Sequence, residues 1–206
     1  MGLFKKYVNQ TRKPEGFLGK MMVNGMNGGH AKMADWGMSH LTTIAPQEML
    51  DIGCGGGRNV NELLKKYSST KATAIDYSDI SVAKATSYNE DMIKAGRCNV
   101  QQGDVSRLGF ENQYDLATAF ETIYFWPGLE KCFGEVYKAL KTGGTFMIVN
   151  ESDGTDKASL QFEKIIEGMK CYTVDEIENA LITAGFSKVI TDHHKSKPWI
   201  TVIARK

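Results

Sequence analysis

One short stretch constrains the fold of this chain more than any other. Residues 49–59 read MLDIGCGGGRN, so the acid Asp51 is followed by four glycines within six residues. The apolar residues before Asp51 are typical of the end of a buried strand, and residues 58–67 carry apolar side chains at helical spacing. Because glycine accepts positive φ and lets a ligand approach the backbone closely, the segment predicts a strand, a tight turn and a helix, in that order.

Strands and helices alternate along most of the remaining chain. Short apolar runs predict strands at residues 47–52, 71–75, 98–102, 114–119, 145–150, 187–192 and 199–204. Helical periodicity predicts helices at residues 58–67, 79–95, 129–140 and 174–184. This alternation predicts an α/β fold with a doubly wound, mostly parallel, seven-stranded sheet that helices cover on both faces. The linker before the last strand is too short for a crossover helix, so the last strand is expected to be reversed.

The N-terminal residues do not follow this alternation. Residues 16–40 are too rich in glycine for a stable isolated helix, yet too apolar for a linker. We expect residues 1–40 to form a helical arm or lid of one or two short helices, and residues 41–206 to form the main domain.

The net charge, the cysteines and the histidines argue against several kinds of binding partner and metal site. A formal net charge of +1 gives no global electrostatic reason to expect nucleic acid or an anionic membrane as a partner. The four cysteines contain no C-x-x-C pair, so they predict neither a zinc site nor a disulfide framework. The spacing of the four histidines supports no metal site. No apolar run reaches eighteen residues and no signal peptide is recognisable, so a cytoplasmic protein is expected.

The glycine loop itself excludes two common nucleotide sites. The dinucleotide fingerprint G-x-G-x-x-G fails in both registers, because its third glycine would fall on Arg58 or Val60. A phosphate-binding Walker loop needs a Gly-Lys-Ser/Thr sequence, which does not follow the loop. Asp51 would repel a phosphate and attract a cation, which favours a phosphate-free cationic ligand such as S-adenosylmethionine. The structural alternative is that Asp51 simply caps the loop.

These features together resemble the class I S-adenosylmethionine-dependent methyltransferases, in particular the small single-domain group related to ubiquinone and menaquinone C-methyltransferases. The loop DIGCGGG matches the family motif E/D-x-G-x-G-x-G, and LKTGGTFMIVN and the AGF at residues 184–186 match later family segments. The resemblance covers roughly residues 45–206. It implies a Rossmann-like methyltransferase fold and S-adenosyl-L-methionine as the cofactor.

The resemblance also implies which residues bind the cofactor. Asp76 lies 23 residues after Gly53 and matches the acid that binds both ribose hydroxyls, and Tyr77 would lie against the adenine. Asp104 matches the acid that accepts from the adenine amino group, with Val105 as a backbone donor. Helix capping by Asp76 and a turn role for Asp104 are the structural alternatives. The expected cofactor-binding residues are Asp51, Gly53, Cys54, Gly55, Gly57, Asp76, Tyr77, Ser78, Gly103, Asp104, Val105 and Phe120.

The stretch FETIYFWP at residues 120–127 is unusually aromatic for a loop after a strand. It either covers the end of the sheet or forms the wall of an apolar pocket that holds one buried acid. The expected substrate pocket consists of Met26, Trp36, Glu121, Tyr124 and Trp126.

Methyl transfer is an in-line displacement that requires positioning and exclusion of water, and it requires a base only where the acceptor is protonated. The candidate bases are Glu121, His30 and Tyr124, in that order, and a merely packed or solvated His30 is the alternative.

The sequence therefore predicts an enzyme that transfers a methyl group from S-adenosylmethionine to a small, partly apolar molecule. The alternatives are a methyltransferase that acts on RNA or protein and a cofactor-binding module of the same fold without catalysis. An RNA-modifying enzyme would normally carry a basic face or an additional RNA-binding domain. We expect a monomer or homodimer with no nucleic-acid or membrane partner.

Overall fold

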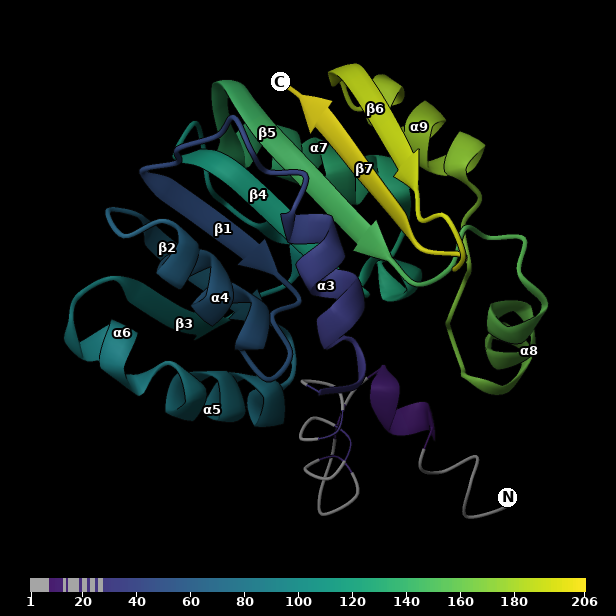
Figure 1. Cartoon of the computed structure of the whole chain (residues 1–206), viewed down its shortest axis with the longest axis horizontal. Coiled ribbons are helices and arrows are strands. Elements are labelled where there is room, and N and C mark those ends of the chain that lie inside the picture. Colours follow the sequence, from purple (N-terminus) through teal and green to yellow (C-terminus); the bar gives the residue numbers. More distant parts are fainter. Residues whose placement is uncertain (1–7, 13, 15–18, 20–21, 23–24, 26–27) are drawn as a thin grey trace.

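The computed structural model of the chain describes residues 8–12, 14, 19, 22, 25 and 28–206. Its centre is a seven-stranded sheet in the order β3-β2-β1-β4-β5-β7-β6 (Figure 1). The strands are β1 (Glu48–Ile52), β2 (Lys71–Asp76), β3 (Cys98–Gln102), β4 (Tyr114–Phe120), β5 (Leu140–Asn150), β6 (Ser187–His193) and β7 (Ile200–Arg205). The pairs among β1 to β5 are parallel, and β7 runs antiparallel to both β5 and β6. The predicted doubly wound sheet with a reversed last strand is confirmed.

Helices cover both faces of the sheet, as the alternation predicts. One face is covered by α3 (Ala31–Met38), α4 (Arg58–Lys66) and α5 (Asp79–Tyr88), whose buried residues share a core with the strands. The other face is covered by α7 (Leu129–Ala139) and α9 (Val174–Thr183), which lie behind the sheet in Figure 1. Two further helices, α6 (Glu90–Lys94) and α8 (Lys157–Ile165), lie at opposite sides of the molecule in this view. Single turns of 3₁₀ helix are η1 (Asn9–Thr11), η2 (Val105–Arg107) and η3 (Ile123–Phe125).

The order of the strands fixes where a ligand can bind. The chain passes from β1 outward to β2 and β3, then returns to pair β4 with the other side of β1. At such a reversal, the loops at the carboxyl ends of the strands separate and leave a crevice. The glycine loop follows β1 and the aromatic loop at residues 120–127 follows β4, so both border this crevice.

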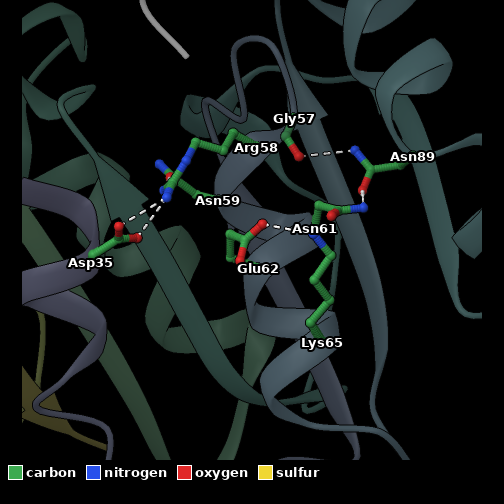
Figure 2. A network of polar contacts seen from close by, with 8 residues as sticks. All are labelled: Asp35, Gly57, Arg58, Asn59, Asn61, Glu62, Lys65 and Asn89. Atoms are coloured by element: carbon green, nitrogen blue, oxygen red, sulfur yellow. Dashed lines mark hydrogen bonds and ion pairs between the residues drawn. The ribbon is translucent and has the colours of Figure 1, made fainter. Parts of the chain in front are cut away.

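The predicted helix at residues 79–95 is divided into α5 and α6 at Asn89, which is fully buried. The Asn89 side chain donates to the carbonyl oxygen of Gly57 and accepts from the Asn61 amide (Figure 2). It also donates to the carbonyl oxygen of Ala85. This buried amide network stabilises the last residue of the glycine loop, Gly57, through its carbonyl oxygen. It also explains Gly57, since a Cβ there would lie 2.5 Å from the Asn89 amide nitrogen.

Helix α3, which falls within the predicted arm, is part of the core. Met33, Ala34 and Met38 are buried in the same cluster as β1 and α4. A Cβ at Gly37 would lie 2.5 Å from a methyl group of Val149 in β5, so glycine is what allows the helix to approach the sheet this closely. Residues 31–38 are therefore packed against the sheet as part of the core and do not form a lid.

Two segments differ from the sequence-based expectation. Strand β5 begins at Leu140, five residues before the predicted strand at residues 145–150. Helix α8 was not predicted, although Asp156 caps it by accepting from the Ser159 N–H. Across the described residues, no helix combines the length and the apolar character that a membrane span requires.

Candidate functional site

A cavity of about 290 Å³ lies at the carboxyl edge of the sheet. Its wall is built from the glycine loop, from the loops after β2, β3 and β4, and from Arg12 and Pro14 of the N-terminal segment. The lining residues are Arg12, Pro14, Ile52, Gly53, Gly55, Ile75, Asp76, Tyr77, Ser81, Gly103, Asp104, Val105, Phe120, Glu121, Thr122, Phe125, Trp126 and Pro127.

A smaller cavity of about 50 Å³ adjoins the first. It is lined by His30, Gly53, Cys54, Gly55, Gly56, Arg58, Asn59, Phe120 and Glu121. Gly53, Gly55, Phe120 and Glu121 lie on the walls of both cavities, so these residues mark where the two meet.

Most of the predicted cofactor residues lie on these walls. Eight line the larger cavity: Gly53, Gly55, Asp76, Tyr77, Gly103, Asp104, Val105 and Phe120. Cys54 lines the smaller cavity. Asp51, Gly57 and Ser78 are described but lie on neither wall. Ser78 is instead the N-cap of α5, where its hydroxyl accepts from the Ser81 N–H.

Asp76 ends β2 and holds the glycine loop in place. The Gly55 N–H donates to its Oδ2 and the Ser78 N–H donates to its Oδ1, each at 2.9 Å. Burial raises the pKa of this carboxyl, while the two backbone hydrogen bonds oppose that shift. The carboxylate therefore contacts the glycine loop and lies on the cavity wall, as the predicted binding role requires, whereas the N-cap of α5 is Ser78 and not Asp76.

Asp104 follows β3 and is more exposed. Its Oδ1 accepts from the Ser106 N–H at 2.8 Å, and this bond holds the pKa of the carboxyl below its ordinary value. Asp104 thus caps η2 and remains an ionised hydrogen-bond acceptor on the cavity wall.

Asp51 lies beneath the loop and is almost fully buried. Its Oδ1 accepts from the Thr118 hydroxyl at 2.7 Å, and its Oδ2 has no hydrogen-bond partner among the described residues. Burial raises the pKa of Asp51 to about 7, and the charge of Asp76 adds to this shift. The N–H groups of Gly53 and Cys54 donate to the Ile75 carbonyl, so Asp51 does not cap these two groups.

Position 53 requires glycine because the loop after β1 and the loop after β4 lie very close together there. Its φ is +73°, and a Cβ there would lie 2.2 Å from the hydroxyl oxygen of Thr122. Thr122 in turn accepts from the Trp126 indole N–H at 3.2 Å. The absence of a side chain at Gly53 thus lets the loop after β4 close against the loop after β1.

Glu121 begins the loop after β4 and lies where the two cavities meet. Its φ of +56° is in the left-handed region, which is costly for a residue with a side chain and is found mostly at functional sites. Its Oε1 accepts from the Tyr124 hydroxyl at 3.0 Å and from the Glu151 N–H. Burial raises the pKa of Glu121 to about 7, while the nearby His30 opposes the shift.

His30 lies opposite two carboxylates. Its Nδ1 is 3.3 Å from Glu151 Oε2 and 3.8 Å from Glu121 Oε2. The contact with Glu151 raises the pKa of His30, and burial acts in the opposite direction. The structure therefore joins two of the predicted bases, His30 and Glu121, with a second acid, Glu151, which directly follows β5.

Tyr124 and Trp126 have different positions. Tyr124 is buried behind Glu121, where its hydroxyl also accepts from the Ser152 N–H at 3.1 Å, and it lines neither of the two cavities. Burial raises the pKa of its phenol well above the ordinary value, so it acts as a hydrogen-bond donor to Glu121. Trp126 lines the larger cavity, as predicted.

The other two predicted pocket residues are not placed at the site. Trp36 packs against His40, His194 and Trp199, with ring centroids at 4.9, 5.3 and 6.3 Å, and lies on neither cavity wall. Its position on α3 directs it away from the crevice, which spacing alone does not reveal. Met26 falls outside the described residues.

An ion pair connects α3 to the glycine-loop helix. The Arg58 guanidinium contacts both carboxylate oxygens of Asp35, at 2.8 and 2.9 Å (Figure 2). Because Arg58 also lines the smaller cavity, this pair links the packed arm helix to the site.

Sequence reasoning missed several lining residues and one acid. Arg12 and Pro14 reach the cavity from before α3, and Thr122, Phe125 and Pro127 complete the aromatic loop. Glu151 directly follows β5, as Tyr77 follows β2. The rule that selects polar residues at the carboxyl ends of parallel strands would have found Glu151 as well.

Comparison with known proteins agrees with this arrangement. A family model described as "Methyltransferase domain" matches residues 46–198. The chain is 29% identical over 165 residues to the sterol 24-C-methyltransferase of Saccharomyces cerevisiae, an alignment that covers 73% of this chain and 43% of that protein. The chain therefore spans less than half the length of this curated relative.

Two solved structures share the fold. A putative O-methyltransferase from Nostoc punctiforme superposes with a TM-score of 0.81 at 18% identity, covering 94% of this chain and 61% of that chain. Phosphoethanolamine N-methyltransferase 2 of Haemonchus contortus, in complex with S-adenosyl-L-methionine, gives a TM-score of 0.73 at 16% identity, covering 85% and 52%. At these identities the two likenesses establish the fold alone.

Proposed function

We propose that this chain, which belongs to the class I S-adenosylmethionine-dependent methyltransferases, transfers a methyl group from S-adenosylmethionine to a small, partly apolar molecule. One observation carries the proposal. The glycine loop, Asp76 and Asp104 converge on a single cavity of about 290 Å³. Ionised carboxylates accept hydrogen bonds from hydroxyl and amino groups and repel phosphates, which suits an unphosphorylated nucleoside.

The adenosine part of the cofactor fits the larger cavity. Each oxygen of Asp76 accepts one backbone N–H, which leaves lone pairs on both oxygens for the ribose hydroxyls. Asp104 and the Val105 N–H would hold the adenine edge, and Tyr77 offers a ring on the same wall.

The methionine part would extend past the glycine loop toward the smaller cavity. Arg58 brings positive charge to that wall, which favours the carboxylate of the methionine. Asp51 lies beneath the loop, where its ionised form would stabilise the ammonium and the sulfonium. The sulfur would then lie near Glu121 and Phe120, where the cavities meet.

The acceptor would approach across the aromatic loop. Phe125, Trp126 and Pro127 give this part of the wall an apolar surface. The relative named as a sterol 24-C-methyltransferase supports an apolar acceptor. A closer relation to the ubiquinone and menaquinone C-methyltransferases remains a prediction.

In the transfer step, the acceptor atom forms a bond to the methyl carbon while the bond from carbon to sulfur breaks. S-adenosylhomocysteine leaves with the electron pair of that bond. The chain contributes alignment and exclusion of water. Where the acceptor carries a proton, Glu121 and His30 are the residues placed to receive it, and Tyr124 orients Glu121.

We also propose that the protein works in the cytoplasm as a monomer or homodimer. All four cysteines are free and buried, which suits a reducing compartment. A methyltransferase acting on RNA or protein, and a cofactor-binding module without catalysis, remain the alternatives.

The first test is cofactor affinity by isothermal titration calorimetry. Asp76→Ala should weaken S-adenosylmethionine binding by about 1–3 kcal/mol, because the ribose loses hydrogen bonds to a charged acceptor. The control is Asp79→Ala, which removes an exposed acid three residues further on. Equal affinity in wild type and Asp76→Ala, or binding of NAD in place of S-adenosylmethionine, would contradict the proposal.

The second test identifies the acceptor class. Methyl-labelled S-adenosylmethionine is incubated with the protein and, in separate arms, an apolar metabolite extract, total RNA and a protein extract. Label in the metabolite arm alone is the expected result. Label confined to RNA or protein supports the macromolecular alternative, and binding without any label supports the non-catalytic one.

A further inference from the structure

We infer that His30, Glu121 and Glu151 form a binding site for a divalent transition-metal cation, on which a hydroxyl oxygen of the methyl acceptor would be held. The acceptor assignment rests on the proposed methyl transfer, whereas the metal site rests on geometry alone. The spacing of the histidines does not indicate this site, because two of the three ligands are glutamates that follow the neighbouring strands β4 and β5.

The three side chains converge from separate parts of the fold. His30 is the N-cap of α3, Glu121 follows β4 and Glu151 follows β5. One ligand atom from each lies within 4.8 Å of the other two. In a site with metal–ligand bonds of roughly 2.1 Å, neighbouring ligand atoms are about 3.0–3.4 Å apart. The distances of 3.3 and 3.8 Å from His30 Nδ1 to the two carboxylates are close to that spacing.

The His30 Nδ1 atom is the second, independent observation. It is buried and makes no hydrogen bond of good geometry among the described residues, and its 3.3 Å contact with Glu151 Oε2 is an ion pair only when the imidazole is protonated. Burying a polar ring nitrogen without a hydrogen bond or a metal bond costs free energy. A cation between the ring and the two carboxylates would satisfy all three groups at once.

The surroundings of Glu121 suit a ligand role. Its Oε1 accepts from the Tyr124 hydroxyl and the Glu151 N–H, so the carboxylate is held with Oε2 directed at His30. Outer hydrogen bonds of this kind orient metal ligands and strengthen metal binding.

The position of the site connects it to methyl transfer. Glu121 lies where the two cavities meet, which is where the transferring methyl group is expected. The side chains of His30, Glu121 and Glu151 are 32%, 14% and 38% exposed, so solvent and an acceptor can reach them. Three protein ligands leave coordination positions open for an acceptor oxygen.

One imidazole and two carboxylates favour cations such as Mn²⁺, Fe²⁺ or Zn²⁺ over the purely oxygen-preferring Ca²⁺. With the cation bound, His30 and Glu121 act as ligands in place of acting as bases. The cation lowers the pKa of a coordinated hydroxyl, whose proton passes to water. The oxygen then attacks the methyl carbon, the O–C bond forms, and S-adenosylhomocysteine departs with the electrons of the S–C bond. The acceptor class is therefore a hydroxyl or enol with an apolar body.

The test is a Mn²⁺ titration of the full chain. Binding is monitored by electron paramagnetic resonance, in which bound Mn²⁺ no longer contributes to the free-ion signal. Glu151→Gln and His30→Gln each remove one ligand and should weaken Mn²⁺ binding at least about 10–100-fold. Glu130→Gln and His193→Gln change exposed residues of the same types and should bind Mn²⁺ as wild type does. Absence of Mn²⁺ binding to wild type, or equal binding by Glu151→Gln, would overturn the inference and leave His30 as a protonated partner of the two acids.

A parallel titration with S-adenosylmethionine separates this inference from the proposed function. Glu151→Gln that still binds the cofactor is folded, so its loss of Mn²⁺ affinity reports the metal site. Loss of cofactor binding in wild type would contradict the proposed function while leaving the metal result intact.

Discussion

The two ends of the candidate site are built in different ways. At the end proposed for adenosine, Asp76 is the last residue of β2 and Asp104 follows β3, and both accept from backbone N–H groups of adjoining loops. At the acceptor end, Glu121, Glu151 and His30 come from three separated segments and are held largely by side chains. The first end is a local consequence of strand, turn and helix, whereas the second exists only once α3 has packed on the sheet.

This difference implies that the two ends respond differently to mutation. A change in the glycine loop should disturb the local framework and hence stability. A change at the contact between α3 and α4 should leave the framework intact and affect mainly how the arm helix is held over the smaller cavity.

The largest effect is expected from Gly53→Ala. Positive φ costs about 1–2 kcal/mol for alanine, and the added Cβ would overlap the Thr122 hydroxyl, which lies 2.2 Å from its position. We expect urea unfolding to show a loss of about 2–4 kcal/mol. Gly109→Ala is the matched control, because its φ is +69° but no described atom lies within 4 Å of the added Cβ.

The control should lose only the backbone cost of about 1–2 kcal/mol. Adding Thr122→Ala to Gly53→Ala should restore part of the stability. If Gly53→Ala and Gly109→Ala lose the same amount, the close approach of the two loops is not what requires glycine at position 53.

A second, pH-dependent effect is expected from Asp51. Its pKa is raised in the folded state to about 7 from an ordinary value of 3.8. The protonated carboxyl therefore favours the fold at low pH, and this contribution is lost as the pH rises from about 4 to about 7. Asparagine mimics the protonated form, so the stability of Asp51→Asn relative to wild type should rise with pH, by at most about 1.4 kcal/mol per pH unit.

Urea unfolding of both proteins at pH 5 and pH 7.5 measures this slope. A constant difference between the two proteins would show that Asp51 does not titrate in this range. Cofactor binding to wild type should also release protons near pH 7 if the ligand's positive charge ionises Asp51.

The smallest effect is expected from the ion pair between Arg58 and Asp35. The Asp35 side chain is 55% exposed, so a double-mutant cycle with Arg58→Gln and Asp35→Asn should give a coupling of only about 0.2–1 kcal/mol in stability. Because Arg58 lines the smaller cavity, Arg58→Gln should weaken S-adenosylmethionine binding more than Asp35→Asn does. Equal effects of the two variants on affinity would argue that Arg58 only anchors α3.

The sequence by itself determined the sheet, its reversed last strand and most of the residues that line the larger cavity beside the glycine loop. These features follow from short-range patterns, since apolar runs mark strands, and glycines and acids mark the turns at their carboxyl ends. The sequence also predicts that Glu121 and Trp126 belong to the pocket, and both line the larger cavity. Helical periodicity does not reveal the break at Asn89, because the Asn89 side chain bonds to Gly57 and Asn61 of a distant segment as well as to Ala85 of its own helix.

Only the tertiary structure decided which face α3 presents, and this choice had the largest consequences. It directed Trp36 toward His40 and Trp199, away from the cavities, and brought His30 against Glu121 and Glu151. Helical spacing shows which residues of a short helix share a face, but the orientation of the helix depends on contacts such as that of Gly37 with Val149. Such contacts join residues more than a hundred positions apart, and no local pattern in the sequence encodes them.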